Sequence, residues 1–495
     1  MKAVQALVLS LLQASLMAVT SASGAVPPDH ARKTDDHAPP AASRAIQNTP
    51  GSGLISRLIR EASEGDTIVV PSGLHREHLR IDKTIILDGG GRAIIDGGGS
   101  GDIVEITAPG VTLRGFTIRN TGIDLDAENA AVRAVAPRVV IEDNMFSDIL
   151  FGIDLRESPD SVVRRNIIGG KSLDTARRGD GLRLWRCDRT VIEDNIIHDG
   201  RDAILWYSTG VVIRRNTGRD CRYGLHLMFS DDVVIDDNEF SGNSVGIYLM
   251  YSTGIEIRRN RLVRNRGPSG YGIGLKESDR FVISDNVIAA NRAGLYIDGS
   301  PFTTRAPGVI RRNSIAFNDV GVMFLPSARG NELTENNFID NIDQVRVAGR
   351  GSLEANRFWS GERGNFWTDY TGYDADHNGV GDFVHEPSTL FENLMDREPS
   401  MRLFLFSPAQ QAIEFVGRAF PSICPEPKFS DEVPLMRPVA IETSAATRQA
   451  SPGPLAAAAA LLLAVGGGIT AAARAGPSTC RRDQSAIGSS LGAIP

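Results

Sequence analysis

The chain has 495 residues, of which 51 are glycine, whereas aromatic residues make up 6% and hydrophobic residues 41%. This scarcity of large side chains argues against a globular core rich in aromatic residues and favours a fold with many tight turns. The formal charge is −7, from 53 basic and 60 acidic side chains, which argues against nucleic acid as a partner.

Residues 1–25 have the pattern of a secretory signal peptide. Lys2 precedes an apolar run from Ala3 to Val19, and the small residues of 21–25 follow it. An uncleaved membrane anchor is the alternative interpretation. Residues 26–50 are rich in Pro, Ala and polar residues without apolar periodicity, so they predict a disordered linker. The protein is therefore expected to be exported.

A helix is predicted at the start of the folded region. Leu54, Ile55, Leu58 and Ile59 lie at helical spacing within 51–64, just before an expected strand at 67–70.

The central part of the chain is a repeat in which a short apolar strand ends in a polar pair and an asparagine. The repeated asparagines are Asn144, Asn166, Asn195, Asn216, Asn238, Asn260, Asn286, Asn313, Asn336 and Asn356. Most are spaced by about 22 residues, with longer gaps where loops are inserted.

A glycine followed by an alternating strand forms a second marker of each repeat. These glycines are Gly152, Gly181, Gly224, Gly246, Gly272, Gly294 and Gly321, and Ala203 takes the place in the one repeat that lacks the glycine. Six residues after each marker comes a small residue: Ser158, Cys187, Thr209, Ser230, Ser252, Ser278, Ser300 and Ser327. Cys187 is therefore expected to be structural.

Together these markers predict an all-β fold, a right-handed parallel β-helix with coils of about 22 residues. Each coil would place Asn against Asn and a small residue against a small residue of the next coil. We expect one solenoid over 51–360, closed at its start by the 51–64 helix, and a capping or docking segment over 361–440.

The alternation of each strand assigns its side chains to a face. After each marker the first and third residues should face the core, and the second and fourth should face solvent. The second residues are Asp154, Arg183, Leu205, His226, Tyr248, Gly274, Tyr296 and Met323. The fourth residues are Arg156, Trp185, Tyr207, Met228, Met250, Lys276, Asp298 and Leu325.

This outward face is unusually rich in aromatic, Met and His side chains, which indicates a partner or ligand surface around Trp185, Tyr207, Tyr248, Tyr296 and Met323. His226, Met228 and Met250 lie on adjacent coils, and imidazole with thioether suits a soft ion such as Cu(I). The alternative is that these residues only pack beneath an inserted loop or the C-terminal segment.

A second candidate metal site lies after the coils. Asp374, Asp376, Asn378 and Asp382 have the spacing of a calcium-binding loop, although His385 stands where that loop has an acidic residue. The alternative is an Asp/Asn/Gly turn held by its own hydrogen bonds.

Near the C-terminus, a linker at 441–454 leads to an uncharged, Ala-rich segment at 455–473. Its length suits a transmembrane helix, and arginines in the 474–495 tail would hold that tail in the cytoplasm. An Ala-rich tail that does not cross the membrane is the alternative.

Several segments along the chain follow one another in a specific order. They are GLRLW, RDAILWYSTG, RYGLHLMFSDD, GIYLMYS, GIGLKESD, GLYIDGS, GNFWTDYTGYDADHNGVGD, LF at Leu390 and Phe391, LFLFSP and VPLMRP. In order and spacing they resemble the NosD family, periplasmic proteins that mature nitrous oxide reductase. The likeness covers about 51–440, and the 455–495 region lies beyond it.

The resemblance implies a non-enzymatic maturation factor that handles copper, or cargo for the copper-sulfur centre. It further implies an ABC-type ATPase, a membrane permease, a copper-chaperone lipoprotein and nitrous oxide reductase as partners. It strengthens the expectation that His226, Met228 and Met250 handle copper. No phosphate-binding loop for ATP is present in the sequence, so the ATPase would be a separate chain.

Two other functions remain open. A carbohydrate enzyme, a uronate C5-epimerase or polysaccharide lyase, would need acid, base and cationic groups around one sugar. The nearest candidates, Asp154, Arg156, Arg183 and Lys276, are expected to be spread over five or more coils. A surface adhesin or passive scaffold would present a mixed polar face, unlike the His, Met and Tyr columns.

Overall fold

The computed structural model describes residues 53–441, except 304–305, 349–350, 388–390, 392–393, 396–397, 406 and 421–426. The predicted signal peptide, the 26–50 linker, residues 442–454 of the second linker, the 455–473 segment and the tail lie outside the described residues. Among the residues that the structure describes, no helix is long and apolar enough to cross a membrane.

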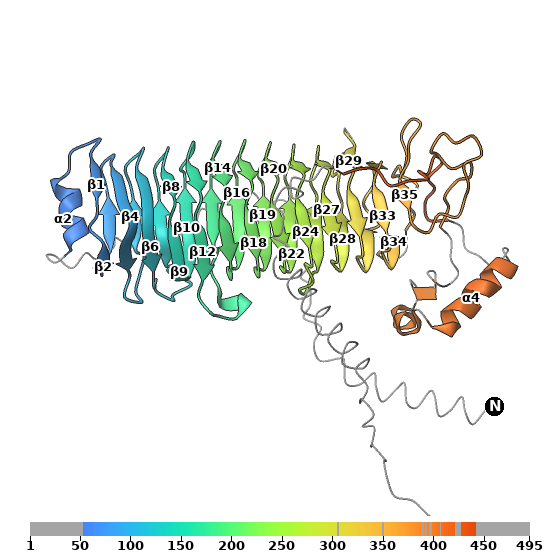
Figure 1. Cartoon of the computed structure of the whole chain (residues 1–495), viewed down its shortest axis with the longest axis horizontal. Helices are drawn as coiled ribbons and strands as arrows, with labels where there is room; N and C mark the ends of the chain where they lie inside the picture. Colours follow the sequence, from blue (N-terminus) through green and yellow to red (C-terminus); the bar gives the residue numbers. More distant parts are fainter. Residues whose placement is uncertain are drawn as a thin grey trace, which may run out of the picture. The chain divides into compact units, whose positions relative to one another are not determined.

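The folded region begins with the predicted helix. Helix α2 (Leu54–Glu61) lies at the start of the stacked coils (Figure 1). It buries Ile55 and Ile59 in the core, and Leu58 packs beside them. Glu77 accepts hydrogen bonds from the backbone N–H groups of Ile55 and Ser56 at the start of the helix. The helix thus covers the end of the core, as expected of a cap.

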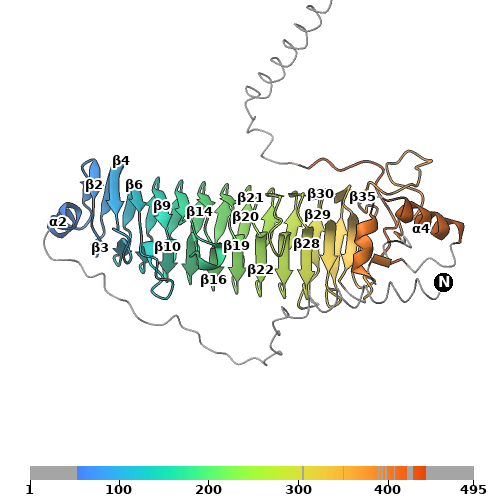
Figure 2. The ribbon, with the colours of Figure 1, turned by 90° about the horizontal axis from the view of Figure 1, so that it is seen from below.

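Parallel strands then stack coil upon coil (Figures 1 and 2). The 12-stranded sheet consists of β3 (Leu79–Ile81), β5 (Val104–Ile106), β7 (Ala130–Ala134), β10 (Phe151–Arg156), β13 (Leu182–Trp185), β16 (Asp202–Trp206), β19 (Tyr223–Met228), β22 (Val245–Met250), β25 (Tyr271–Lys276), β28 (Ala293–Asp298), β31 (Val320–Phe324) and β34 (Asp343–Val347).

The remaining coil strands form two further ladders that begin from β1 (Thr67–Val69), β2 (Gly73–His75), β4 (Ile86–Asp96) and β6 (Thr112–Arg119). The first ladder continues through β8 (Val140–Glu142), β11 (Val162–Arg164), β14 (Val191–Glu193), β17 (Val212–Arg214), β20 (Val234–Asp236), β23 (Glu256–Arg258), β26 (Val282–Ser284), β29 (Gly308–Arg311) and β32 (Asn331–Thr334). The second continues through β9 (Met145–Ile149), β12 (Ile167–Gly170), β15 (Ile196–His198), β18 (Thr217–Arg219), β21 (Glu239–Ser241), β24 (Arg261–Val263), β27 (Val287–Ala289), β30 (Ser314–Ala316), β33 (Asn337–Ile339) and β35 (Phe366–Trp367). The predicted parallel β-helix is confirmed.

The remaining helical elements are short. The 3-10 helix η1 (Thr175–Arg177) lies in the insertion between β12 and β13. After the coils come the 3-10 helix η2 (Pro399–Phe404) and helix α4 (Pro408–Ala419), whose N-terminus is capped by the Ser407 side chain.

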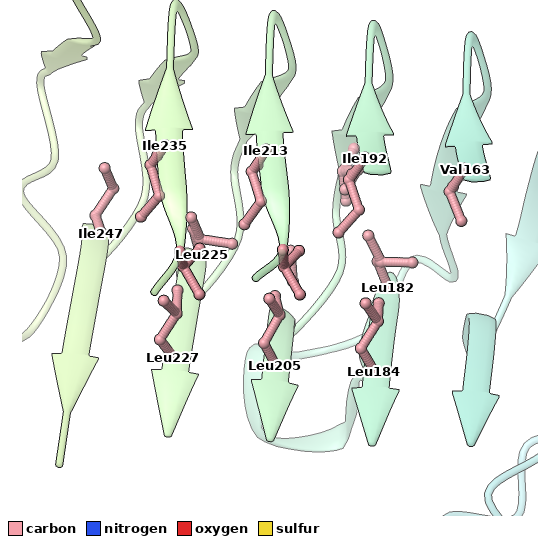
Figure 3. Packing of buried hydrophobic residues seen from close by; sticks show 14 of the residues in the cluster. Val163, Leu182, Leu184, Ile192, Leu205, Ile213, Leu225, Leu227, Ile235 and Ile247 are labelled. Carbon is pink, nitrogen blue, oxygen red and sulfur yellow. The ribbon is translucent and has the colours of Figure 1, made fainter. Parts of the chain in front are cut away.

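Aliphatic side chains from all three ladders fill the core. Figure 3 shows Leu184, Leu205 and Leu227 in one inward row of the 12-stranded sheet, facing isoleucines of the first ladder. The expectation that Leu205 faces outward is therefore wrong. Ile204 takes the outward place, because β16 is paired one residue earlier than the Gly marker suggested.

The asparagine ladder is the most regular polar feature of the core. From Asn144 to Asn336, each asparagine donates its backbone N–H and its Nδ2 to Oδ1 of the asparagine in the next coil, at 2.8–3.1 Å. The last partner is Asn365, so the place predicted for Asn356 is wrong. Asn356 instead accepts from Asn331 in a separate pair, since an inserted segment displaces it from the corner.

A second asparagine ladder, not predicted from the sequence, lies in the same core. Two members of the small-residue ladder also differ from those predicted. The second ladder comprises Asn243, Asn265, Asn291, Asn318 and Asn341. In the small-residue ladder, Ser208 rather than Thr209 accepts from the backbone of Cys187, and Ser327 is exposed outside the ladder. Cys187 itself is buried there, and burial raises its pKa to about 12, as befits a structural thiol.

Charges alternate in sign along one outward column of the first ladder. The paired residues are Asp88, Arg114, Glu142, Arg164, Glu193, Arg214, Asp236 and Arg258, in successive coils. Arg164 contacts Glu142, and Arg214 contacts Glu193, both at 2.7 Å. Each charge between Asp88 and Arg258 therefore has opposite charges above and below it.

Segment 427–441 packs against the last coil. Phe429 stacks on Phe358 with ring centres 4.2 Å apart, and buried Asp431 accepts hydrogen bonds from Trp367 Nε1 at 2.8 Å and Asn365 N at 2.7 Å. Burial raises the pKa of Asp431 to about 6, although these hydrogen bonds act in the opposite direction.

Replacing Asn216 by Ala should lower the free energy of unfolding by about 3 kcal/mol or more. The change strands the backbone N–H of Asn195 and one N–H of its Nδ2, whose other N–H still donates to the carbonyl of Val163, and it removes a donor from the carbonyl of Ile192. An unpaired buried polar group costs about 1–3 kcal/mol. Urea denaturation followed by circular dichroism measures the loss. Thr217→Ala, at a half-buried neighbouring residue, is the control, and an equal effect of both changes would contradict the role of the ladder.

The 427–441 segment should be held more weakly as pH rises through about 6. Folding raises the pKa of Asp431 above its ordinary 3.8, so the folded state retains a proton longer, and stability falls between about pH 4 and pH 6. In Asp431→Asn this loss of stability with rising pH should disappear, which leaves the opposite dependence of buried His385, whose pKa is lowered by burial. Hydrogen exchange of the Trp367 indole N–H measures it, and a wild-type rate of opening that does not change across this range would refute the prediction.

Candidate functional site

The outward face of the 12-stranded sheet carries the candidate site, and its columns differ in two places from those expected. Trp206, not Tyr207, lies between Trp185 and Met228 in the column of fourth residues. The cause is the coil that contains β16, in which Asn195 and Asn216 are 21 residues apart, whereas the following coil spans 22. One missing residue shifts the assignment of Leu205 and Tyr207 by one position.

The structure brings His226 and Met250 together. They come from adjacent strands β19 and β22, and His226 Nε2 lies 3.4 Å from Met250 Sδ. His226 was expected to face solvent, but it is only 5% exposed, because neighbouring aromatic side chains cover it. Met250 is half-buried. An imidazole nitrogen and a thioether sulfur thus converge at one point.

Met228 lies in the same column as Met250 but has a different partner. Its Sδ accepts a hydrogen bond from Trp206 Nε1 at 3.1 Å. In Met250 the thioether faces the imidazole, whereas in Met228 it faces the indole of the preceding coil. Met228 is therefore adjacent to the His226–Met250 pair, and its sulfur is engaged by the indole of Trp206.

Aromatic rings surround the imidazole. Tyr223 packs edge-on against His226 with ring centres 5.0 Å apart, and Tyr248 lies over it at 6.0 Å. The ring of Tyr248 extends across Gly274, where a Cβ would clash with it. Burial raises the pKa of both phenols, so they remain neutral hydrogen-bonding groups at neutral pH.

Below the imidazole lies a carboxylate that the sequence analysis missed. Asp202 Oδ2 is 3.5 Å from His226 Nδ1, and the Asp202 side chain is fully buried. Burial alone would raise the pKa of Asp202, but the adjacent His226 and Arg222 outweigh it and the pKa is lowered. The shortened coil was the available signal for Asp202 and for Trp206, since a break in a repeat marks a local exception.

An aromatic stack lies at the corner beside the two methionines. Tyr207, Phe229 and Tyr251 each have φ of 51–55°, a conformation that bulky residues rarely adopt. Their rings stack with centres 5.2 and 4.9 Å apart, and the Lys276 ammonium lies 5.7 Å from the Tyr251 ring centre. Tyr207 and Phe229 remain 44% and 42% exposed. The stack therefore forms an accessible border of the site.

Further along this face, Tyr296 and Met323 lie in the predicted column and are half-buried. Tyr296 stacks on Tyr271 with ring centres 4.3 Å apart, and burial raises the pKa of Tyr296 to about 12. Trp185 contacts Tyr207 edge-on at 4.9 Å. The predicted surface residues thus form two groups, one on each side of His226.

At the other end of the sheet, charged residues expected to be apart or in solvent are buried together. Asp154 is wholly buried and accepts hydrogen bonds from Arg133 at 2.7 Å, Arg183 at 2.9 Å and Arg156 at 3.0 Å. Glu128, from the loop before β7, also accepts from Arg183. The arginines lower the pKa of Asp154 to about 2 against the opposing effect of burial. Lys276 is separate from this network.

The calcium-like loop is an exposed turn closed by its own hydrogen bonds. Asp374 accepts from the backbone of Asn378 and Gly379 at 3.1 and 2.9 Å, and Asp382 accepts from Ala375 at 2.8 Å. Asp376 accepts from both nitrogens of Asn378. No group of three His, Cys, Asp or Glu residues able to hold a metal occurs within the part of the chain that the structure describes. These contacts are those of the alternative Asp/Asn/Gly turn.

Comparisons with known proteins agree on one family. The family model described as periplasmic copper-binding protein (NosD) matches residues 165–372. A probable ABC transporter binding protein NosD of Pseudomonas aeruginosa is 30% identical over 386 residues, which cover 75% of this chain and 88% of that protein. A protein of the same description from Stutzerimonas stutzeri is 28% identical over 385 residues, covering 74% and 86%.

Among solved structures, the A-module of mannuronan C-5 epimerase AlgE6 from Azotobacter vinelandii is similar with a TM-score of 0.50 and 15% identity. The match covers 61% of this chain and 92% of that module, and at this identity it shows the fold alone. The alignment with the Pseudomonas aeruginosa relative covers most of both proteins, and the segment matched by the family model contains the coils of His226 and Met250. The chain therefore belongs to the NosD family, whose model is described as a periplasmic copper-binding protein.

Proposed function

We propose that this protein is a non-enzymatic maturation factor that accepts Cu(I) on the outward face of its 12-stranded sheet and passes it on for the copper centres of nitrous oxide reductase. The observation that carries the proposal is the convergence of His226 Nε2 and Met250 Sδ, 3.4 Å apart on adjacent coils. Membership of a copper-binding family supports the choice of metal.

The donor set suits Cu(I) because imidazole and thioether are ligands for a soft ion. His226 and Met250 would supply the first two ligands. Met228 would supply a third once its sulfur exchanges the Trp206 hydrogen bond for the ion. Without a thiolate or carboxylate ligand the site would hold copper reversibly, which is what a transfer protein requires.

The names of the relatives and the accessible part of this face support the proposed partners. Both relatives are named as ABC transporter binding proteins, which supports an ABC-type ATPase and a membrane permease as partners of this chain. Tyr207 and Phe229 border the proposed copper site and are accessible to a copper-chaperone lipoprotein or to the reductase. The description of the family as periplasmic supports a location in the periplasm.

A carbohydrate enzyme is the competing proposal, and the Asp154 network argues against it. A catalytic base must reach its substrate, but Asp154 has no exposed surface and bonds to three arginines. Its depressed pKa also makes it a weak base. We therefore assign the network to the stability of the coils.

The copper proposal predicts that the soluble protein binds Cu(I) under reducing conditions and that His226→Ala/Met228→Leu/Met250→Leu abolishes this binding. Competition with a chromophoric Cu(I) chelator measures it. Met145→Leu, an exposed methionine on β9 outside the site, is the control and should bind as the wild type does. Equal binding by the triple variant would remove the site assignment while leaving the fold intact.

The same triple variant tests the role in maturation. When it replaces the wild type in cells that produce nitrous oxide reductase with the transporter, the purified reductase should contain less copper. Full copper content in the reductase would refute this role.

The structural role of the charged network predicts that Asp154→Ala lowers the free energy of unfolding by about 3–5 kcal/mol, since it leaves buried arginines without their carboxylate. Cu(I) binding by the folded fraction should be unchanged. Glu256→Ala, which removes an exposed carboxylate paired with Arg258, is the control and should leave stability nearly unchanged. A stable Asp154→Ala protein would argue for a functional role of this residue.

A further inference from the structure

The coil that contains β16 is an exception to the repeat at one position. In other coils a glycine stands there because a Cβ would clash with the carbonyl of the next coil, as at Gly152, Gly224 and Gly246. This coil lacks the glycine. The carbonyl of Asp202 accepts from Gly181 N as the carbonyl of Asp180 accepts from Gly152 N, so Asp202, like Asp180, stands one place before the glycine position. The missing residue leaves the Asp202 carboxylate opposite Tyr223, on the strand next to that of His226.

A shift in strand pairing accommodates Asp202. Asp202 pairs with Tyr223, but Ile204 pairs with His226, so β19 has one more residue than β16 over this stretch. A bulge of this kind re-aims a side chain. The same shift sets His226 opposite Ile204, with its Nδ1 facing the Asp202 carboxylate.

The carboxylate is held from its far side. Asp202 Oδ1 accepts from Arg222 Nε at 2.9 Å and from Tyr223 N at 3.3 Å. Oδ2 accepts from Arg222 Nη2 and lies 3.5 Å from His226 Nδ1. One oxygen thus faces the imidazole on the side opposite to Met250.

We propose that Asp202 is a positioning residue for copper, which keeps the imidazole proton of His226 on Nδ1 and leaves the lone pair of Nε2 directed at Met250. A neutral imidazole has one donor and one acceptor nitrogen, and an ionised carboxylate can only accept. The thioether of Met250 also accepts, but it is a much weaker acceptor than a carboxylate, so the proton lies on Nδ1 and Nε2 is the nitrogen available to a metal. The inference rests on the proposed function of His226 as a ligand.

The decisive variant is Asp202→Asn. The amide oxygen should take the Oδ1 place, where two donors converge, so that the NH2 group faces His226 Nδ1. Nδ1 must then accept, and the proton moves to Nε2, where it blocks the metal. We expect a loss of about 10- to 100-fold in Cu(I) affinity, the usual effect of removing a partner of a metal-bound histidine.

Two measurements test this inference. Long-range 1H–15N correlation spectra of the histidine rings, with the His226 signals identified by their absence in His226→Gln, report the position of the proton without copper. Chelator competition reports the affinity. Asp180→Asn is the matched control, because Asp180 is an equally buried carboxylate that pairs with Arg201 in the preceding coil. It should change neither quantity.

A wild-type proton on Nδ1 that moves to Nε2 in Asp202→Asn, together with weaker Cu(I) binding, supports the inference. A wild-type proton on Nε2, or an unchanged affinity in Asp202→Asn, overturns it, and the wild-type spectrum decides this even if the variant does not fold. If the wild type binds no Cu(I) while the proton lies on Nδ1, the copper proposal fails but the positioning of the imidazole by Asp202 stands.

Discussion

The hydrogen bond between asparagines of successive coils is the interaction on which the rest of this structure depends. Each Oδ1 accepts from both the backbone and the side chain of its neighbour, so each coil is aligned to the next at one corner. Strands of the 12-stranded sheet then meet at the usual separation of about 4.8 Å. That alignment is what sets His226 beside Met250, residues 24 positions apart in the chain. A shift of one residue in the register of β19 or β22 would turn His226 or Met250 into the core.

The repeat made the fold, its capping helix and most of the columns predictable, because period and alternation are visible in the residues themselves. The errors have one main cause. A coil with one residue fewer moved the assignments of Leu205, Tyr207 and Thr209, and nothing local distinguishes a deletion before the strand from one after it. The burial of Asp154 was unpredictable for another reason. The arginines that surround it are also held by Glu128, which comes from a loop whose path the repeat does not define.

The candidate site shows how a regular repeat can carry a specific site in one of its coils. Most outward positions of the sheet tolerate many side chains, because strand pairing depends on the backbone. In the proposed copper site, Asp202 and Trp206 come from the coil in which the glycine is missing. Together with Tyr223 they gather around His226 and Met228 of the next coil. The relatives establish the family, while the geometry of these side chains is what makes a soft-metal site on this face physically reasonable.

The alternating column from Asp88 to Arg258 has a consequence for how such a protein can change length. Removing a single coil from this region would set carboxylate on carboxylate or guanidinium on guanidinium at the new junction, whereas removing two adjacent coils would restore the original sequence of signs. The smallest unit that can be gained or lost without electrostatic penalty is therefore a pair of coils. Descendants of this chain should differ in length, within this region, by steps of two.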